Sequence, residues 1–475
     1  MATKNKILQA AAGQAGGGGG AGLSVEDVFS NYLYTGNGST QTITNGIDLD
    51  GEGGLVWLKS RTFSGQHVLY DTERGSDSAI FSSLSNGAVT SVASYTLDFN
   101  SDGFTTDTSG GNVNTSGKDE VSWTFRKAPK FFDVVTYTGT GSAQTIAHNL
   151  GSTPAAIFIK CTSATGNWAV YHGGLTDPSE HYLILNSTTG AVTHEGALFW
   201  NSTLPTDSVF SIGTATSLNI SGRSYVAYLF AHNDGDGGFG PDADQDIIKC
   251  GSYTGNGSSQ DINLGFEAQW VMIKPASVAG NWNIMDVMRG MPTSGTSAKR
   301  LIPNTSNTEL SLNSLYGTRA LATGFTILGT TLAEFNKSGE EYIYMAIRRG
   351  AKVPESADEV FEPTKNVRNV SPTFYSGWPV DFGIGRYMLQ GYGPSNKNYA
   401  YSRLTGNERL ETFSTATAAG FGAGDEGFDN MTGADLTISS AESTGDGMAW
   451  LWKRAPTFFD VVAYTGNGTA GRTVS

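Results

Sequence analysis

The chain has 475 residues, of which 62 are glycine and only 16% are charged, and its formal net charge is −14. This charge opposes binding to nucleic acid, because affinity for a phosphate backbone comes mainly from Lys and Arg, so we expect no nucleic-acid partner. Its apolar runs fall short of the roughly 18 residues that cross a membrane, and its N-terminus lacks the apolar core of a signal peptide. We therefore expect no membrane insertion.

Residues 1–30 differ in composition from the rest of the chain. They include an unbroken glycine run at 16–20, and glycine-rich segments lose much conformational entropy when they become ordered. We predict an N-terminal attachment peptide followed by a flexible tether. A plain disordered tail is the alternative interpretation of the same residues.

From residue 31 onward the chain repeats itself about four times. The element Tyr-Thr-Gly-x-Gly occurs at Tyr34, Tyr137, Tyr253 and Tyr464, and these tyrosines are 103, 116 and 211 residues apart. The last interval holds two units, so the period is roughly 105 residues. A repeat of this length indicates a string of domains, each with its own core, and not a solenoid of short repeats.

Two further markers recur in phase with the tyrosine element. Asn114, Asn219 and Asn336 each open an Asn-x-Ser-Gly turn, with a degenerate copy at 442–445, and an aromatic run follows each turn. Such runs predict strands at 121–125, 225–230, 342–347 and 448–452. Because alternate strand residues face a core, we expect Trp123, Phe125, Tyr228 and Phe230 to be buried.

The other marker is an apolar strand that ends in lysine. It ends at Lys59, Lys160 and Lys274 in the first three units, whereas the segment 382–387 of the fourth unit carries no lysine. In the second and third units an Asn-Trp pair follows, at Trp168 and Trp282. Short strands with dense turns predict an all-β fold of tandem β-sandwich domains in a row.

The markers divide the chain into units. We expect β-sandwich units at 31–133, at 134–248 with an acidic linker, at 249–369 with a linker, and a divergent one at 370–456. Residues 454–468 nearly repeat residues 127–141, so 457–475 should be the incomplete start of a further unit. Either the natural chain continues beyond Ser475, or this segment adds as an edge strand to a neighbouring subunit.

Two kinds of binding site are candidates. Carboxylates at Asp234, Asp236, Asp242, Asp244 and Asp246 could hold Ca²⁺, a hard cation that prefers oxygen ligands; solvated acidic turns are the alternative. The indoles of Trp168, Trp282 and Trp378 could stack on sugar rings, against the alternative of core packing. We predict no catalytic residues, no other cofactor and no enzymatic activity.

Several phrases resemble a known group of proteins. The segments 53–59, 100–104, 166–172 and 221–228 are similar to modules repeated in tail-fibre and related virion proteins of marine bacteriophages, including cyanophages. The resemblance implies concanavalin-like, jelly-roll β-sandwiches and a structural or host-recognition role. It supplies no catalytic residues.

The sequence therefore predicts a bacteriophage virion structural protein that is assembled in the host cytoplasm. We expect a tail fibre or appendage, a homotrimer that joins other virion tail proteins through its N-terminus. Weak multivalent contacts would bind a host cell-surface glycan or protein. The alternatives are a capsid or tail decoration protein and a host-polysaccharide depolymerase; glycosidases need a pair of carboxylates, and no acidic pair recurs in all four units.

Overall fold

The computed structural model confirms an all-β fold. Among the described residues, its helices are the single turns α2 (Val25–Val28) and α3 (Leu49–Glu52) and the 3-10 turns η1 (Ala357–Glu359) and η2 (Arg403–Thr405). No helix among the described residues is long and apolar enough to cross a membrane. The structure describes residues 22–462 and Gly471, with gaps at 91–95, 107–111, 195–196, 293–297, 313–316, 330–332, 368–371, 389–397, 407, 413–414, 416–418, 421–427, 429 and 437–445.

Unit 1 pairs a six-stranded antiparallel sheet with a three-stranded one. The strand orders are β1-β9-β3-β4-β5-β6 and β2-β8-β7. The strands are β1 (Phe29–Thr35), β2 (Gln41–Thr44), β3 (Gly54–Ser60), β4 (Val68–Asp71), β5 (Ser78–Phe81), β6 (Val89–Thr90), β7 (Leu97–Asn100), β8 (Gly103–Thr106) and β9 (Asp119–Arg126).

Unit 2 repeats this arrangement, with the orders β10-β17-β12-β13-β14-β15 and β11-β16. Its strands are β10 (Phe132–Thr138), β11 (Gln144–Ala147), β12 (Ala156–Cys161), β13 (Ala169–His172), β14 (His181–Ile184), β15 (Val192–Thr193), β16 (Val209–Ile212) and β17 (Ser224–Phe230).

Unit 3 has the orders β18-β26-β20-β21, β19-β25-β24 and β22-β23. Its strands are β18 (Ile248–Thr254), β19 (Gln260–Asn263), β20 (Ala268–Pro275), β21 (Asn283–Asp286), β22 (Lys299–Arg300), β23 (Leu310–Ser311), β24 (Thr318–Leu321), β25 (Gly324–Ile327) and β26 (Glu341–Arg348).

Unit 4 returns to six strands in the order β27-β34-β29-β30-β31-β32, with β28-β33 beside them. Its strands are β27 (Phe361–Lys365), β28 (Phe374–Tyr375), β29 (Phe382–Met388), β30 (Asn398–Ser402), β31 (Glu408–Glu411), β32 (Ala419–Gly420), β33 (Gly433–Ala434) and β34 (Asp446–Trp452).

Unit 4 begins earlier than the sequence predicts. Its opening strand starts at Phe361, inside the segment expected to be a linker that ends at 369. The strand contains Pro363, a residue type common in linkers. However, β27 is the edge strand of its sheet, and a proline at an edge costs no ladder hydrogen bond when its missing N–H would face away from the sheet. The predicted attachment peptide and glycine run at 1–21 lie outside the described residues, as does most of 463–475.

The tyrosine and asparagine markers meet in space and join the first strand of a unit to its last turn. The side-chain oxygens of Asn114, Asn219 and Asn336 accept hydrogen bonds from the backbone N–H groups that follow the first Gly of the Tyr-Thr-Gly-x-Gly element, at 2.8 to 2.9 Å. The hydroxyls of Tyr34, Tyr137 and Tyr253 donate to carbonyls just before these asparagines. The repeated polar residues therefore have an architectural role.

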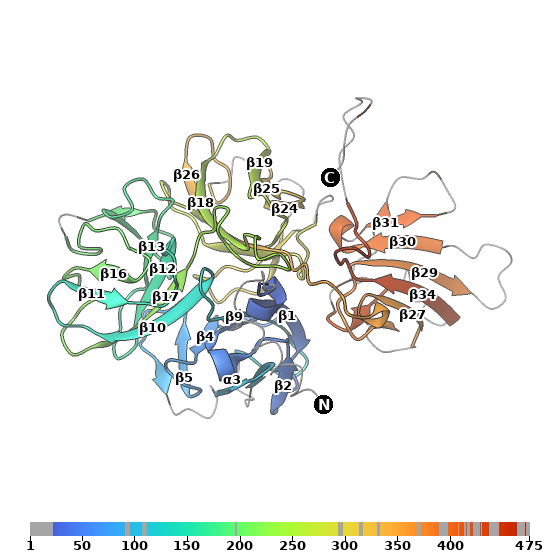
Figure 1. The fold of residues 1–475 in the computed structure, drawn as a ribbon, viewed down its shortest axis with the longest axis horizontal. Coiled ribbons are helices and arrows are strands. Elements are labelled where there is room, and N and C mark those ends of the chain that lie inside the picture. The colour runs from blue at the N-terminus through green and yellow to red at the C-terminus, as the bar shows by residue number, and fades with distance from the viewer. Residues whose placement is uncertain are drawn as a thin grey trace.

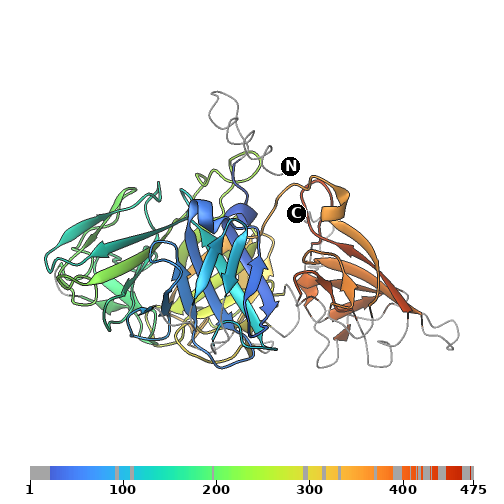
Figure 2. The same ribbon diagram turned by 90° about the horizontal axis from the view of Figure 1, so that it is seen from below.

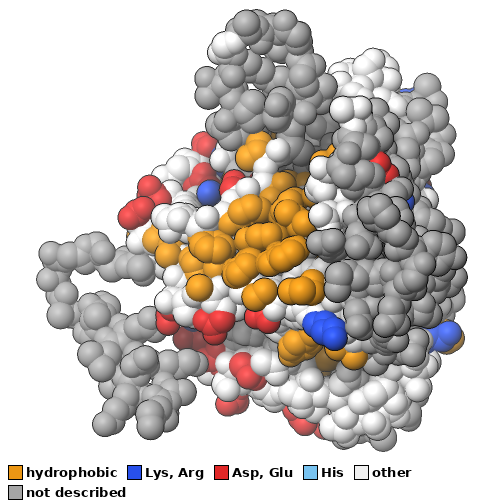
Figure 3. Space-filling model, turned by 90° about the vertical axis from the view of Figure 1, so that its right-hand side faces the viewer, with side chains coloured by type: hydrophobic (Ala, Val, Ile, Leu, Met, Phe, Trp, Pro, Cys, Tyr) orange, Lys and Arg blue, Asp and Glu red, His pale blue; other side chains and the backbone are white. Residues whose placement is uncertain are grey.

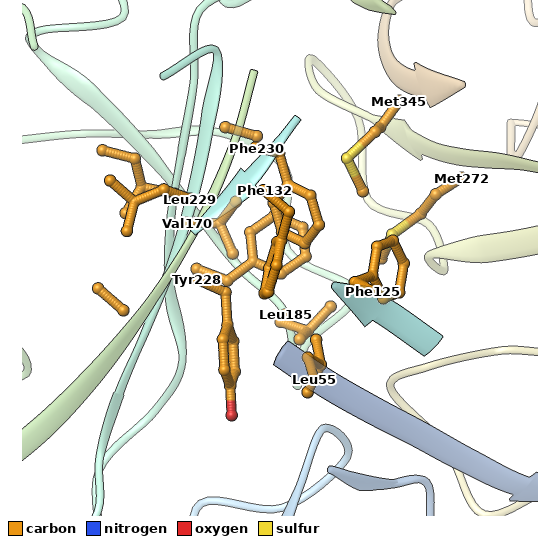
Figure 4. Close-up of a cluster of buried hydrophobic side chains, with 14 of the residues drawn as sticks. Leu55, Phe125, Phe132, Val170, Leu185, Tyr228, Leu229, Phe230, Met272 and Met345 are labelled. Atoms are coloured by element: carbon orange, nitrogen blue, oxygen red, sulfur yellow. The ribbon is translucent and has the colours of Figure 1, made fainter. Parts of the chain in front are cut away.

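The first three units close into a ring around one shared hydrophobic core. Phe125 of unit 1 lies 5.5 Å from Phe230 of unit 2 and 6.1 Å from Trp270 of unit 3, between ring centroids. Figure 4 shows Phe125, Phe132, Phe230, Met272 and Met345 converging from different units. Units 1 to 3 are therefore not independent domains in a row, because they share their largest hydrophobic core.

Apart from terminal residues, the closing strands β9 and β17 are buried on both faces, so their burial does not alternate along the strand. Trp123, Phe125, Tyr228 and Phe230 are all buried, as expected. They contribute to the shared core rather than to the interior of a single sandwich. Unit 1 keeps a second, smaller cluster between its own two sheets, which includes Ile43, Val56 and Phe104.

Unit 4 lies beside the ring and has its own core. Figures 1 and 2 show it, in orange and red, set apart from the three ring units. Its interior cluster includes Phe374, Tyr401, Leu436 and Leu451. The chain is thus a three-unit ring followed by a separate sandwich.

Candidate ligand cleft

Two of the predicted sugar-binding tryptophans are structural. Trp168 and Trp282 are buried, and their indole N–H groups donate across ring interfaces to the carbonyl oxygens of Phe81 and Ile184, at 2.9 and 3.0 Å. Each indole therefore fastens its unit to the preceding one. The prediction of sugar contact at these two residues is wrong, because the flat apolar face that would stack on a sugar is enclosed by the neighbouring unit.

The lysine markers act at the same interfaces. Lys160 donates to the carbonyl of Ser85 in unit 1, and Lys274 donates to that of Thr188 in unit 2. Lys59 donates to carbonyls of its own unit. Burial away from water lowers the pKa of Lys59 and Lys160 to about 8 and that of Lys274 to about 7.

The interface between units 3 and 1 closes the ring with a different set of groups. Arg61 forms an ion pair with Glu309 at 2.9 Å, and the Glu309 N–H donates to the Arg61 carbonyl. The Trp123 indole donates to Asp286 at 3.2 Å, and the Arg289 guanidinium lies over the same indole. Equivalent backbone contacts at the other two interfaces run from Ala88 to Thr162 and from Ala191 to Ala276.

The acidic segment forms a loop in which Phe239 and Gln245 pair through their backbones. The Asp246 carboxylate accepts hydrogen bonds from the N–H groups of Gly235 and Gly237 and lies 3.6 Å from Lys249. Asp242 and Asp244 are exposed. Among the described residues, no group of three or more potential ligands converges on one point, so calcium binding by Asp234, Asp236, Asp242, Asp244 and Asp246 stays a prediction.

The third tryptophan lies in a cleft between the ring and unit 4. The cleft has a volume of about 330 Å³ and is lined by β1 of unit 1, by Gln269 and Met288 of unit 3, and by Trp378 and Met431 of unit 4. Trp378 is half-buried, and its N–H donates to the Asp358 carbonyl at 2.9 Å. This bond fixes the orientation of the indole at the cleft wall.

Asn31 is the unusual residue of this cleft. It is 5% exposed, and among the described residues its side-chain nitrogen and oxygen are both buried without a hydrogen-bond partner. The corresponding positions of units 2 and 3, in register with Tyr228 and Met345, are Val134 and Cys250. A buried amide without partners costs free energy, so its presence at an otherwise apolar position makes Asn31 a candidate contact for a ligand.

Charged groups form the floor between the ring and unit 4. Arg454 holds Glu267 of unit 3 through two hydrogen bonds of 2.8 Å, and its own N–H donates to Asp381. Arg403 lies 3.6 Å from the same Asp381. These pairs join unit 4 to the ring beside the cleft, and the half-buried indole of Trp378 and the amide of Asn31 are two further groups of the cleft lining.

A comparison with known protein families gives a match to the ring. A family model described as "Domain of unknown function (DUF7483)" matches residues 25–349. The chain belongs to this family. The match runs from the first residue of α2 to the residue after β26, so the family domain coincides with the whole three-unit ring and excludes unit 4. No curated protein and no solved structure matches the chain.

Sequence reasoning found Trp378 but missed Asn31. The Asn-Trp pair already sets Trp168 and Trp282 apart from Trp378, but only the fold shows that this pair marks an interface. Asn31 has a signal in the sequence, since it interrupts an apolar alternation that reads Phe29, Asn31, Leu33 on one face of β1. That signal gains meaning only when the opening strands of units 1, 2 and 3 are aligned.

Proposed function

We propose that this protein is a structural component of a bacteriophage virion, an appendage that holds a glycan-binding cleft on a rigid ring. The resemblance to tail-fibre modules supports the virion assignment. The architectural use of the repeated residues supports the role of the ring as a rigid body, because the markers hold strands and units together. The alternatives, a decoration protein and a depolymerase, have no specific observation in their favour.

The observation that carries the binding proposal is the pairing of Trp378 with Asn31 in one cleft. An indole face offers a flat apolar surface to the C–H face of a sugar ring. An amide offers two donors and an acceptor, which match neighbouring hydroxyl groups. A pocket with an aromatic wall and a few convergent polar groups is the usual form of a small-ligand site, and its size admits a short oligosaccharide.

Binding is tested with the full chain and glycans released from the surface of the phage's host. We expect wild-type protein to bind a glycan fraction on an array, and Trp378→Ala and Asn31→Val to lower the affinity at least tenfold. Asn31→Val introduces the residue type that unit 2 has at the equivalent position, so the variant should fold. The matched control is Tyr375→Ala, which removes an exposed aromatic of unit 4 that does not line the cleft.

The virion assignment has its own test. Antibody against the full chain should label purified particles of the phage that encodes it, at a projecting appendage. Labelling confined to the capsid shell would favour the decoration protein. Equal glycan binding by wild-type, Trp378→Ala and Asn31→Val protein would refute the cleft as the binding site while leaving the virion assignment open to the labelling experiment.

A further inference from the structure

Each large sheet of the ring carries an apolar row on the face turned toward the other units. We call it the outer row, because it lies outside the two-sheet sandwich of its own unit. It takes one residue from each of five neighbouring strands. The outer rows are Asn31, Trp123, Trp57, Leu69 and Ile80 in unit 1; Val134, Tyr228, Phe158, Val170 and Leu183 in unit 2; and Cys250, Met345, Met272, Ile284 and Leu301 in unit 3. All of them except Asn31 belong to the shared core.

Unit 4 has the same row in the same register. Its members, which all lack a charge, are Pro363, Trp450, Ile384, Ala400 and Leu410. Met448 lies beside Trp450, two residues before it on β34, as Val121 lies beside Trp123 on β9. By strand order, register and residue type, this face of unit 4 is therefore equivalent to the faces that build the ring core.

The two kinds of unit differ in what covers the row. Met448 is 48% exposed, whereas Val121, Val226 and Ile343 at its position in the ring are 0, 0 and 2% exposed. Leu410 is 51% exposed, whereas Ile80 and Leu183 are fully buried. Figure 3 shows an apolar band on this side of the molecule. A contiguous exposed apolar patch on a soluble protein marks an interaction site.

We propose that the outer row of unit 4 packs against the same row of unit 4 in two other copies of the chain, closing a second ring as a homotrimer. Within the chain three such rows already meet around one core, and that ring is closed by the Arg61–Glu309 pair, so a fourth row has no place in it. Every other copy of the chain presents the same outer row of unit 4 in the same surroundings. Closed symmetry is the usual form of such assemblies.

The turn after the closing strand supports this geometry. In unit 1 the turn places Phe132 5.6 Å from Phe125, and in unit 4 it places Phe459 5.9 Å from Trp452. Phe125 then meets the aromatics of the two neighbouring units. Trp452 occupies the position in unit 4 that Phe125 occupies in unit 1, and it packs on Phe361 and Phe382 of its own sheet. In the trimer, Trp452 would contact the aromatic side chains of the two other copies as Phe125 contacts those of the two neighbouring units.

The test is the mass of the full chain in solution. Sedimentation equilibrium of wild-type protein at micromolar concentration should give three times the 50.1 kDa of one chain. Met448→Glu and Leu410→Glu should give the mass of one chain, because each puts a charge into the buried interface. Both residues are about half exposed in the single chain, so the variants should keep the wild-type circular dichroism spectrum.

A matched control uses an equally exposed apolar residue elsewhere. Leu204 lies in unit 2 and is 54% exposed, so Leu204→Glu should remain trimeric. A monomeric wild-type protein would overturn the inference, and so would a dimer. A trimer that survives both Met448→Glu and Leu410→Glu would show that other surfaces hold the copies together. The inference depends on the sheet geometry and not on the cleft, so loss of glycan binding leaves it intact.

Discussion

The ring units and unit 4 present the same apolar face but meet different surroundings. In units 1 to 3 the face is enclosed by two sister units, and each closing strand is buried on both sides. In unit 4 the inner side of the closing strand, Ala449 and Leu451, is buried, while Met448 on the outer side is exposed. The difference shows that a two-sheet sandwich of this type satisfies only one face of its large sheet and needs neighbours for the other.

This contrast also explains which of the repeated residues are shared between units and which differ. Lys160, Trp168 and their equivalents in unit 3 each reach the preceding unit, so the interface of units 1 and 2 and that of units 2 and 3 share these contacts. Unit 4 has Arg386 at the register position of these lysines. Its divergence at the marker positions fits a unit that has no neighbour within the ring.

The largest expected effect separates a ring aromatic from its counterpart in unit 4. Phe125→Ala should lower the free energy of unfolding by about 3 to 5 kcal/mol, because it leaves a cavity where three units meet. Trp452→Ala, measured at a concentration where the chain is monomeric, should cost about 1 kcal/mol, since this side chain is only half-buried. Chemical denaturation measures both, and equal losses would contradict the difference between the two faces.

The next effect concerns the asparagine clamp of the ring units. Asn219 accepts hydrogen bonds from Thr140 and Gln144 and donates to the carbonyls of Ser142 and Gly213. Asn219→Ala leaves several buried groups without partners and should cost about 2 to 4 kcal/mol. The exposed Asn263 serves as the control, and Asn263→Ala should stay within about 0.5 kcal/mol of wild type. A loss below about 1 kcal/mol for Asn219→Ala would show that the clamp is dispensable.

The smallest effect is a pH dependence carried by the interface lysines. An unfolded lysine holds its proton to about pH 10.5, whereas Lys274 in the fold loses it above about pH 7. Between these values the unfolded chain binds more protons, so the contribution of Lys274 to stability rises with pH. Lys274→Met removes this contribution and should flatten the slope of stability between pH 7.5 and 9.5 by up to about 1.4 kcal/mol per pH unit.

Denaturation at a series of pH values checks this expectation. The matched control is Lys337→Met, which changes a lysine of unit 3 that is exposed in the structure. It should leave the slope as in wild type. Parallel curves for wild-type and Lys274→Met protein would mean that Lys274 keeps an ordinary pKa in the fold.

The local structure of this protein was readable from its sequence. The period of the tyrosine element, the Asn-x-Ser-Gly turns and the aromatic alternation of 121–125 and 225–230 predicted repeated β-units and the burial of Trp123 and Phe230. They did so because turn residues and period-two alternation act over a few residues of chain. The edge strand at Phe361 was missed, because Pro363 has the same appearance in a linker and in an edge strand.

Only the tertiary structure decided what the buried residues face. An alternating strand shows which residues share a side, but not whether that side meets its own sandwich, a sister unit or solvent. Trp168 and Trp282 share an Asn-Trp pair that Trp378 lacks, but only the closure of the ring showed that the first two are buried at interfaces and that the third lies in a cleft. Asn31, Val134 and Cys250 occupy one position of the repeat, and only the packing beside unit 4 places Asn31 in the cleft. Long-range packing joins residues that no local pattern connects, and for this reason the ring, the cleft and the open face of unit 4 emerge from the fold alone.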